Sequence, residues 1–493
     1  YLLSLAATYR VDILTPTQQL NTQLLAFLGD CIFSFHPDAV PSVKFKRCKA
    51  YSNVRQLDEL FSDVLDGCAE FNSNLIAASE IFSCNWYSSL YPDIREAMVN
   101  PLSHYLTYGI EEGRSASPGF NDEFYHQTYL SDQDSDLPPL LHYLKFGQHQ
   151  NYQVFPSPLS GDIALREKKR TVLVCGHAAG KQIFGAERSL IEVLDAFADL
   201  KYNVIVAIPD YTNTEYLLAL RKRSHKVLIV PSPLWTQSPI PYEEAVSKFR
   251  EIIDDYSIQA VHTNTIMQRE PLIAAKQAGI RSIVHIHEIV EDNDDACMHI
   301  KMPASSIYQS VSEMADIAIA NSQFTASHLC HFKSVHIVSN SVNFQKFNIE
   351  NKIDSRSINI AIVSSNIEKK GVSDFISIAN LLASVIDNVR FLIIGPGTEY
   401  IKSLKNNVAG ENNKIEFIDY VSEPLLAISK ANIIVSMSTC QETFGRTILE
   451  GMAARRAVIA YDRGAFPELI KDGETGFLIS FKDFDQVAER IKA

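Results

Sequence analysis

Short runs of valine and isoleucine alternate with longer helical patterns from residue 170 onwards, and this alternation limits the folds open to the chain. The apolar runs fall at 171–175, 203–208, 282–286, 359–363, 390–394 and 432–436. One of the helical patterns between them covers Leu190–Leu200. Strands that are apolar on both faces and alternate with helices are typical of parallel sheets covered by helices on both sides. We therefore predict an α/β fold.

The alternating region is too long for a single core. Residues 170–493 exceed the roughly 250–300 residues at which one hydrophobic core stops growing. We predict two Rossmann-like domains, at 170–350 and 355–493, that face each other across a cleft. Ligands of such folds bind beyond the carboxyl ends of the strands, so polar residues after each apolar run are candidate site residues.

Two carboxylates, Glu442 and Glu450, follow the apolar run at 432–436. Ile448, Leu449 and Met452 recur at helical spacing, which places Glu442 in a loop and Glu450 on a helix. Backbone N–H groups at the start of such a helix lack partners and attract phosphate. These groups belong to Phe444, Gly445 and Arg446. A carboxylate in this setting can accept hydrogen bonds from sugar or ribose hydroxyls, although two glutamates at this spacing also occur by chance.

The residues that follow make chance less plausible. After Glu442 and Glu450 come an apolar strand at 457–460, Pro467-Glu468 and Thr475-Gly-Phe-Leu478. This stretch resembles the donor-binding region of the family 4 retaining glycosyltransferases, a family of the GT-B fold. The resemblance runs from about Arg170 to the last residue, with further markers in order. They are His177–Leu190, Val284–Glu288, Ala320–Phe324, Val338–Phe344, Ile362–Gly371 and Ile393–Gly397.

For the second domain, the resemblance implies a nucleotide-sugar donor site. Lys370 would give a positive charge to the diphosphate, although an exposed lysine at a helix start is the plain alternative. Glu450 would accept the ribose hydroxyls, and Glu442 would bind the hexose at the reacting end. The backbone of Phe444 and Gly445 would help to hold the sugar or the phosphate.

One departure from the family pattern concerns the diphosphate. The family usually carries an arginine about five residues before the lysine, where this chain has Ser364-Ser365-Asn366. Lys369, Arg446 or a metal would have to replace the missing guanidinium. We count Asn366 among the donor-binding candidates.

For the first domain, the resemblance implies backbone contacts and one histidine. The segment from Gly180 to Gly185 would approach the diphosphate or the acceptor. His287 would reach the hexose or the attacking hydroxyl, with a hydrogen-bonded core histidine as the alternative. His285, two residues earlier on the same strand, points to the same face.

The resemblance also implies the chemistry. A hexosyltransferase of class EC 2.4 would move a hexose, with retention, from a nucleotide-diphosphate sugar to a glycan or lipid-linked acceptor in bacterial surface polysaccharide synthesis. No metal or other cofactor is expected. Two alternatives remain open: a nucleotide-sugar epimerase or phosphorylase of the same fold, and a catalytically silent domain that binds carbohydrate or serves as a scaffold.

A repeat precedes the α/β region. The pattern that begins at Phe82 and includes His104-Tyr-Leu106 recurs 38 residues later, from Phe120 to His142-Tyr-Leu144 and beyond, without gaps. It resembles a short repeat found beside glycosyltransferase domains of bacterial surface-polysaccharide proteins. We predict a helical module at 81–158 in which the aromatic residues and both histidines belong to the core, rather than to sugar-stacking or metal sites.

Residues 1–80 suggest an α/β fragment, and we assign them no function. The chain starts at Tyr1 and stops within a helical pattern, so we expect an excerpt of a longer polypeptide that could carry other glycosyltransferase domains. A net charge of −13 argues against nucleic acid as the main partner. The eight cysteines show no metal-binding spacing and fit the reducing cytoplasm, and basic groups such as 221–223 could still touch the inner membrane face.

Overall fold

A computed structural model describes residues 74–493, except for 80, 110–111, 113, 118, 132–136, 178, 181, 211–212, 233–234, 236–240, 292–296, 298–299, 348–356 and 409–413. Most of the α/β fragment expected at residues 1–80 lies outside this range. The chain divides into two compact units, Tyr1–Pro156 and Ser157–Ala493. No helix in the described ranges is long and apolar enough to cross a membrane.

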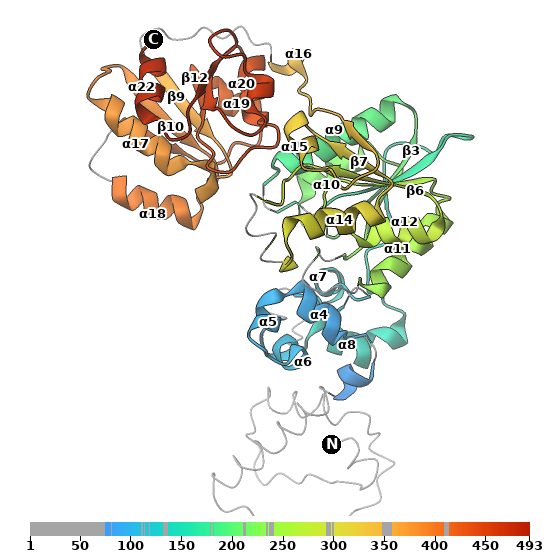
Figure 1. Cartoon of the computed structure of the whole chain (residues 1–493). Coiled ribbons are helices and arrows are strands. Elements are labelled where there is room, and N and C mark those ends of the chain that lie inside the picture. The colour runs from blue at the N-terminus through green and yellow to red at the C-terminus, as the bar shows by residue number, and fades with distance from the viewer. Residues whose placement is uncertain are drawn as a thin grey trace, which may run out of the picture. The chain divides into compact units, whose positions relative to one another are not determined.

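The described part of the first unit is built from short helices (Figure 1). They are α4 (Cys84–Leu90), α5 (Pro92–Glu96), α6 (Pro101–His104), α7 (Asp122–Tyr125) and α8 (Pro139–Lys145), with π-helical turns at Tyr105–Gly109 and His126–Leu130 and a 3-10 turn at Gly147–Gln150. Equivalent contacts recur at a spacing of 38 residues. Tyr87 Oη lies 3.1 Å from His104 Nδ1, and Tyr125 Oη lies 2.9 Å from His142 Nδ1. Both histidines therefore have hydrogen-bond partners among the described aromatic side chains.

A glycine makes room for each tyrosine hydroxyl of the repeat. A Cβ at Gly109 would lie 2.3 Å from Tyr87 Oη, and one at Gly147 would lie 2.1 Å from Tyr125 Oη. Real Cβ atoms do not approach an oxygen so closely, so the tyrosine and the glycine of each repeat depend on each other.

Asp122 joins the two repeats. Its side chain accepts hydrogen bonds from Tyr105 Oη at 2.5 Å and from Ala116 N at 2.8 Å. Burial raises the pKa of Asp122 to about 7, against an ordinary value of about 3.9. The folded chain therefore keeps a proton that the unfolded chain releases between about pH 4 and about pH 7, so the carboxyl favours the folded state most at low pH.

We expect Asp122→Asn to remove a pH dependence from the stability of this unit. In the wild type, the free energy of unfolding should fall as pH rises from about 4 to about 7, by up to about 1.4 kcal/mol per pH unit. The asparagine variant should show a flatter profile. Urea unfolding in a Trp235→Phe background, followed by the fluorescence of the buried Trp86, reports on this unit because the chain has two tryptophans. A wild-type profile that rises with pH over this range would contradict the assignment.

The second unit contains two sheets. The first has the order β1-β4-β3-β2-β5-β6-β7-β8 and is parallel except at its edge, where β1 pairs antiparallel with β4. Its strands are β1 (Leu159–Ser160), β2 (Thr171–Cys175), β3 (Asn203–Ile208), β4 (Lys226–Ile229), β5 (Ala260–Thr263), β6 (Arg281–Ile286), β7 (Ile317–Ala320) and β8 (Val335–Ile337). Its helices are α9 (Gly185–Asp199), α10 (Thr214–Arg221), α11 (Glu243–Asp255), α12 (Glu270–Ala278), α14 (Ala304–Met314), α15 (Gln323–Ser327) and α16 (Phe344–Phe347).

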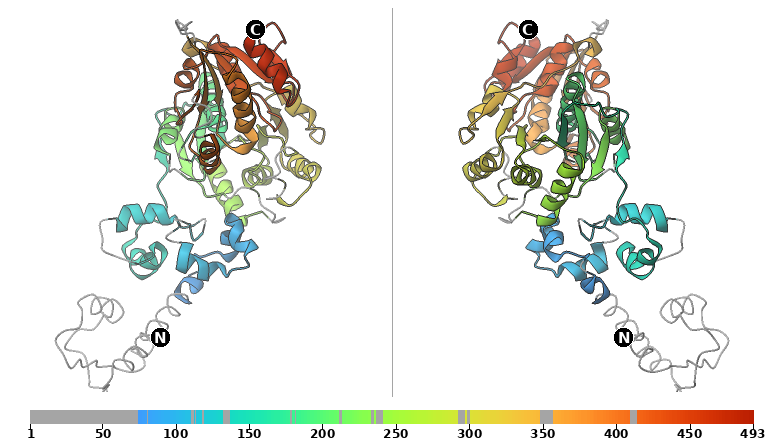
Figure 2. Two further views of the ribbon diagram at one scale, coloured as in Figure 1. Left: turned by 90° about the vertical axis from the view of Figure 1, so that its left-hand side faces the viewer. Right: turned by 90° about the vertical axis from the view of Figure 1, so that its right-hand side faces the viewer.

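Figure 2 shows the strands of the second unit flanked by helices, and successive residues of β2 explain this arrangement. Val172 and Val174 belong to one apolar cluster with α9 and α10. Leu173 and Cys175 belong to another with α11 and α12. Because successive side chains of a strand point to opposite faces, a strand buried on both faces must be apolar throughout.

The second sheet is wholly parallel, in the order β11-β10-β9-β12-β13-β14. Its strands are β9 (Ile358–Val363), β10 (Val389–Ile394), β11 (Ile415–Ile418), β12 (Ile433–Ser436), β13 (Ala457–Tyr461) and β14 (Phe477–Ile479). Its helices are α17 (Val372–Ala383), α18 (Glu399–Val408), α19 (Pro424–Ser429), α20 (Arg446–Ala453), α21 (Phe466–Leu469) and α22 (Phe484–Lys492). Two parallel α/β sheets confirm the predicted fold class.

Candidate donor-sugar site

The second unit has two sheet regions: the first is the sheet β1–β8 with its helices, and the second is the sheet β9–β14 with its helices. A cavity of about 300 Å³ is lined by residues of both regions. The first region supplies Phe184, Gly185 and Arg188. The second supplies Lys370, Glu442, Gly445, Arg446 and Glu450 together with Ser364, Ser365, Tyr420, Ser438 and Thr447. Because the strands β9 and β12 end at this cavity, it occupies the place expected for a ligand of a parallel α/β fold.

Glu442 and Lys370 form an ion pair at the cavity wall. Lys370 Nζ donates to Glu442 Oε1 at 2.6 Å, and Ser438 Oγ donates to the same oxygen at 2.5 Å. The two charged side chains are only 26% and 21% exposed. Burial alone would raise the pKa of Glu442, but the Lys370 charge and the two hydrogen bonds outweigh it and lower that pKa. Burial likewise opposes the charge of Lys370, but Glu442 prevails and raises the lysine pKa. Both groups are therefore charged at neutral pH.

Two glycines shape the backbone around this pair. Gly464 lies so close to the Glu442 loop that a Cβ on it would come within 2.6 Å of Glu442 O, and Ala465 N donates to that oxygen at 2.8 Å. Gly371 follows Lys370 with φ +71° and is the N-cap residue of α17. A Cβ on Gly371 would lie 1.7 Å from Met437 O, so the lysine segment is pressed against the end of β12.

We expect Gly371→Ala to be strongly destabilising, by about 3 kcal/mol or more, because strain at positive φ adds to a backbone clash. Gly473→Ala is the matched control, since Gly473 has φ +74° but no atom within 4 Å of its Cβ position. That variant should cost only about 1–2 kcal/mol. Urea unfolding measures the free energy of unfolding of both variants. Equal losses of stability would show that the close approach of Gly371 to Met437 does not hold the Lys370 segment in place.

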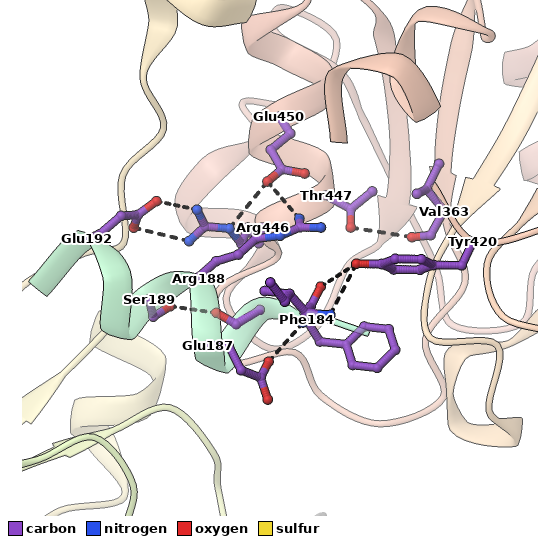
Figure 3. Close-up of polar contacts among 12 residues, drawn as sticks. Phe184, Glu187, Arg188, Ser189, Glu192, Val363, Tyr420, Arg446, Thr447 and Glu450 are labelled. Carbon is purple, nitrogen blue, oxygen red and sulfur yellow. Dashed lines mark hydrogen bonds and ion pairs between the residues drawn. The ribbon is translucent and has the colours of Figure 1, made fainter. Parts of the chain in front are cut away.

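Glu450 is held between two arginines (Figure 3). It lies on α20 with Arg188 Nη1 3.5 Å and Arg446 Nε 3.3 Å from its Oε1. Arg446 also forms a bidentate pair with Glu192 of α9. Burial raises the pKa of Glu450, and the two guanidinium groups oppose that shift. The described partners of Glu450 are therefore cations from both regions of the unit.

The start of α20 is built around Gly445. This residue has φ +90°, and a Cβ on it would lie 2.5 Å from the Phe466 ring. Glycine therefore allows both the left-handed conformation and the close packing. Phe444 is buried and does not line the cavity.

His287 lies just beyond β6, next to the Glu442 loop. Its backbone oxygen accepts a hydrogen bond from Thr443 Oγ1 at 2.6 Å. Its Nε2 lies 3.0 Å from Asn264 Oδ1, and because that oxygen can only accept, Nε2 must carry the proton. Burial lowers the His287 pKa to about 3, so the ring is neutral, and Nδ1 has no partner among the described residues. The His285 ring lies 4.1 Å from that of His287, as expected for residues on one face of a strand.

The other predicted site residues do not line the cavity. Gly180 O accepts from Asn213 Nδ2 at 2.7 Å, and Lys369 O accepts from Thr439 N at 2.9 Å. Asn366 is buried, and its amide donates to Pro396 O at 3.2 Å. The structure thus brings Gly185, Lys370, Glu442, Gly445, Arg446 and Glu450 to one cavity and leaves Gly180, His287, Asn366, Lys369 and Phe444 outside its lining.

Sequence reasoning did not single out several residues of the site. Arg188 and Glu192 lie on α9 and contact the second region, and Tyr420 Oη donates to Ile183 O at 2.8 Å. Arg188 directly follows the Gly-Ala-Glu sequence at 185–187, and its position one turn into a helix beside a predicted site was the available signal. Among the described residues, His, Cys, Asp and Glu side chains form no group of three or more that could hold a metal ion.

Two family models cover most of the second unit. The model described as Glycosyltransferase Family 4 matches residues 183–346, and the model described as Glycosyl transferases group 1 matches residues 358–493. The chain belongs to the family 4 glycosyltransferases. The enzymes of this family are transferases of class EC 2.4, and their GT-B fold is the pair of parallel α/β sheets described above.

Relatives of this family 4 glycosyltransferase include two curated proteins. The capsular polysaccharide biosynthesis glycosyltransferase CapM of Staphylococcus aureus is 27% identical over an alignment of 165 residues that covers 31% of this chain and 43% of CapM. The phosphatidyl-myo-inositol mannosyltransferase of Mycobacterium leprae is 29% identical over 127 residues, which are 25% of this chain and 33% of that protein. The chain thus spans less than half the length of these relatives.

A solved structure shares the fold of this glycosyltransferase. Anabaena Alr3699/HepE in complex with UDP-glucose superposes with a TM-score of 0.52 and 18% sequence identity, over 65% of this chain and 88% of that chain.

Proposed function

We propose that the chain moves a hexose from a nucleotide-diphosphate sugar to a glycan or lipid-linked glycan acceptor, with retention of configuration at the anomeric carbon. The observation that carries this proposal is that Lys370, Glu442, Gly445 and Glu450 line one cavity at the carboxyl ends of β9 and β12. A nucleotide sugar has a ribose, a diphosphate and a hexose, and the cavity offers a group of suitable chemistry for each.

The donor would lie across the cavity with its ribose at Glu450. The carboxylate of Glu450 would accept hydrogen bonds from the ribose hydroxyls, and Lys370 would stabilise the negative charge of the diphosphate. Glu442 would accept hydrogen bonds from hexose hydroxyls. Because Lys370 and Glu442 are paired at 2.6 Å, the group that holds the leaving phosphate and the group that holds the sugar would be fixed relative to each other.

The reaction we propose follows the front-face route inferred from the family resemblance. The bond between the anomeric carbon and the diphosphate oxygen breaks, the acceptor oxygen bonds to the same face of that carbon, and the departing phosphate takes the acceptor proton. His287 would act as a neutral hydrogen-bonding group because its pKa lies far below physiological pH. Its Nδ1 has no partner among the described residues but is buried and outside the cavity lining, so it would have to become accessible on donor binding to accept a hydrogen bond from the hexose or the attacking hydroxyl. The proposal requires neither a metal nor a covalent enzyme intermediate.

The relatives support a role in surface glycan synthesis. CapM is named for capsular polysaccharide biosynthesis, and HepE was solved with UDP-glucose. We propose by analogy a donor of the nucleotide-diphosphate class and a bacterial surface polysaccharide or glycolipid as the product. The proposed location is the cytoplasm, with the acceptor presented at the inner membrane face.

A second candidate is a catalytically silent domain that binds carbohydrate or serves as a scaffold. One observation favours it: Ser364 and Ser365, which are neutral, line the cavity where the family resemblance implies an arginine. Such a domain would bind nucleotide sugars without turning them over.

Thermal shift measurements with UDP-, GDP-, ADP- and dTDP-hexoses test the donor site. A ligand that binds only the folded state stabilises it by RT ln(1 + [L]/Kd), about 2.7 kcal/mol at a hundredfold excess over Kd. We expect one donor to raise the melting temperature of the purified protein in a dose-dependent way. No shift with any of these donors would contradict the proposed function.

A further inference from the structure

We propose that Arg188 is a diphosphate-binding residue, supplied to the donor site by the first sheet region. This inference rests on the proposed function, because it assigns a group of the donor to one more side chain of the same cavity.

The position of Arg188 is fixed by a well-formed helix. It lies one turn into α9, whose start is stabilised by the Glu187 carboxylate accepting a hydrogen bond from Phe184 N at 2.8 Å. Ser189 Oγ donates to Gly185 O at 2.9 Å within the same turn. Figure 3 shows the Arg188 side chain directed from this helix toward Glu450 and Arg446. Arg188 lines the cavity and its side chain is 23% exposed, so a ligand can reach it.

Of the three cationic side chains that line the cavity, Arg188 has the weakest described contacts with carboxylates. Lys370 is hydrogen-bonded to Glu442, and Arg446 forms its bidentate pair with Glu192. The described contact of Arg188 is one ion pair of 3.5 Å to Glu450, an oxygen that Arg446 also approaches. A guanidinium has five N–H donors in a fork that matches phosphate oxygens, so Arg188 keeps donors to offer an anion.

The neighbourhood of Glu450 places Arg188 near the expected phosphates. If Glu450 accepts the ribose hydroxyls, the phosphate is carried by the exocyclic C5′ attached to the same sugar ring. A cation beside Glu450 then lies about one sugar ring from the diphosphate. Ser364 and Ser365, which line the cavity from the second region, can donate hydrogen bonds but bring no charge.

The proposal links the two sheet regions through the ligand. Lys370 belongs to the second region and Arg188 to the first, so the diphosphate would be bound by cations from both. Binding of a nucleoside diphosphate should therefore stabilise the two regions together, whereas a nucleoside without phosphates should do so much less.

The test compares Arg188→Gln with wild type for two ligands that differ only in the phosphates. The tightest binder among UDP, GDP and ADP is measured by calorimetry, and its nucleoside by ligand-observed NMR. We expect R188Q to lower the affinity for the nucleoside diphosphate about 10- to 100-fold, because the lost contact is a charged hydrogen bond to phosphate. The affinity for the nucleoside should fall by less than about threefold. Arg188→Lys keeps the charge but loses the forked guanidinium donors, so its affinity for the nucleoside diphosphate should lie between those of wild type and R188Q.

Controls separate this role from a structural one. Arg223→Gln removes a surface arginine that pairs with Asp195 of α9 at 2.6 Å and does not line the cavity, and it should leave both affinities unchanged. If R188Q does not fold, the affinities of R188K for the two ligands are compared with those of wild type instead. Equal weakening of both ligands, or no weakening of the diphosphate, would overturn the assignment. A wild type that binds none of the three diphosphates would instead overturn the proposed function, and this inference with it.

Discussion

Glu442→Gln is expected to lower kcat by about 10³-fold while nucleoside diphosphate affinity stays within about threefold of wild type. The carboxylate of Glu442 is charged, largely buried and held at 2.6 Å from Lys370 and 2.5 Å from Ser438, so it is fixed where the hexose would react. Glutamine keeps the shape but loses the charge that accepts the hexose hydroxyls. It also leaves Lys370 free to bind phosphate, so product binding should not suffer. Initial rates of donor consumption and calorimetry with the nucleoside diphosphate measure the two effects.

The control for this variant is Glu399→Gln. Glu399 forms an exposed ion pair with Lys402, lies outside the cavity lining and should affect neither quantity. An E442Q enzyme with wild-type kcat would remove Glu442 from the reacting end of the donor. An E442Q protein that has lost nucleotide binding would show that the pair with Lys370 only maintains the fold of the loop.

Glu450→Gln should have the second large effect, a loss of about 100-fold in nucleoside diphosphate affinity. A buried carboxylate that accepts two ribose hydroxyls is replaced by an amide that can accept with one oxygen only. The two arginines that Glu450 balances, Arg188 and Arg446, would keep their charge. Pyrophosphate, which has no ribose, should therefore bind the variant at least as well as the wild type.

Calorimetry with the nucleoside diphosphate and with pyrophosphate separates these outcomes. Glu416→Gln is the matched control, because Glu416 forms an exposed pair with Arg390 and does not line the cavity. Equal losses for both ligands would mean that Glu450 supports the fold of α20 rather than the ribose. Unchanged binding of both would place the ribose elsewhere.

The parts of the site that lie on one stretch of chain could be predicted from the sequence. Glu442 in a loop and Glu450 on a helix follow from the apolar run before them and the helical spacing after them, because each signal is local. The fold class followed from the same kind of pattern, since strands buried on both faces must be apolar throughout.

The contacts between the two sheet regions could not be predicted in this way. Glu192 and Arg446 are 254 residues apart in the sequence, and neither stretch of chain carries a local signal of the other. The pairing of Arg188 with Glu450 depends likewise on how the regions meet. The tautomer of His287 depends on Asn264, which lies 23 residues earlier, just beyond the neighbouring strand β5, and is not part of the histidine motif.

The central claim is that this cavity turns over a nucleotide-diphosphate sugar, and proton NMR of donor consumption tests it most directly. The purified protein is mixed in turn with UDP-, GDP-, ADP- and dTDP-hexoses in the presence of glycan and lipid-linked glycan acceptors, and the anomeric protons of donor and product are followed with time. We predict that one donor is consumed, that free nucleoside diphosphate appears, that the first-formed sugar keeps the donor's anomeric configuration, and that E442Q abolishes the change. A donor that binds but remains intact would contradict the claim and favour the silent domain. A donor converted to its epimer without release of diphosphate would contradict it in favour of an epimerase.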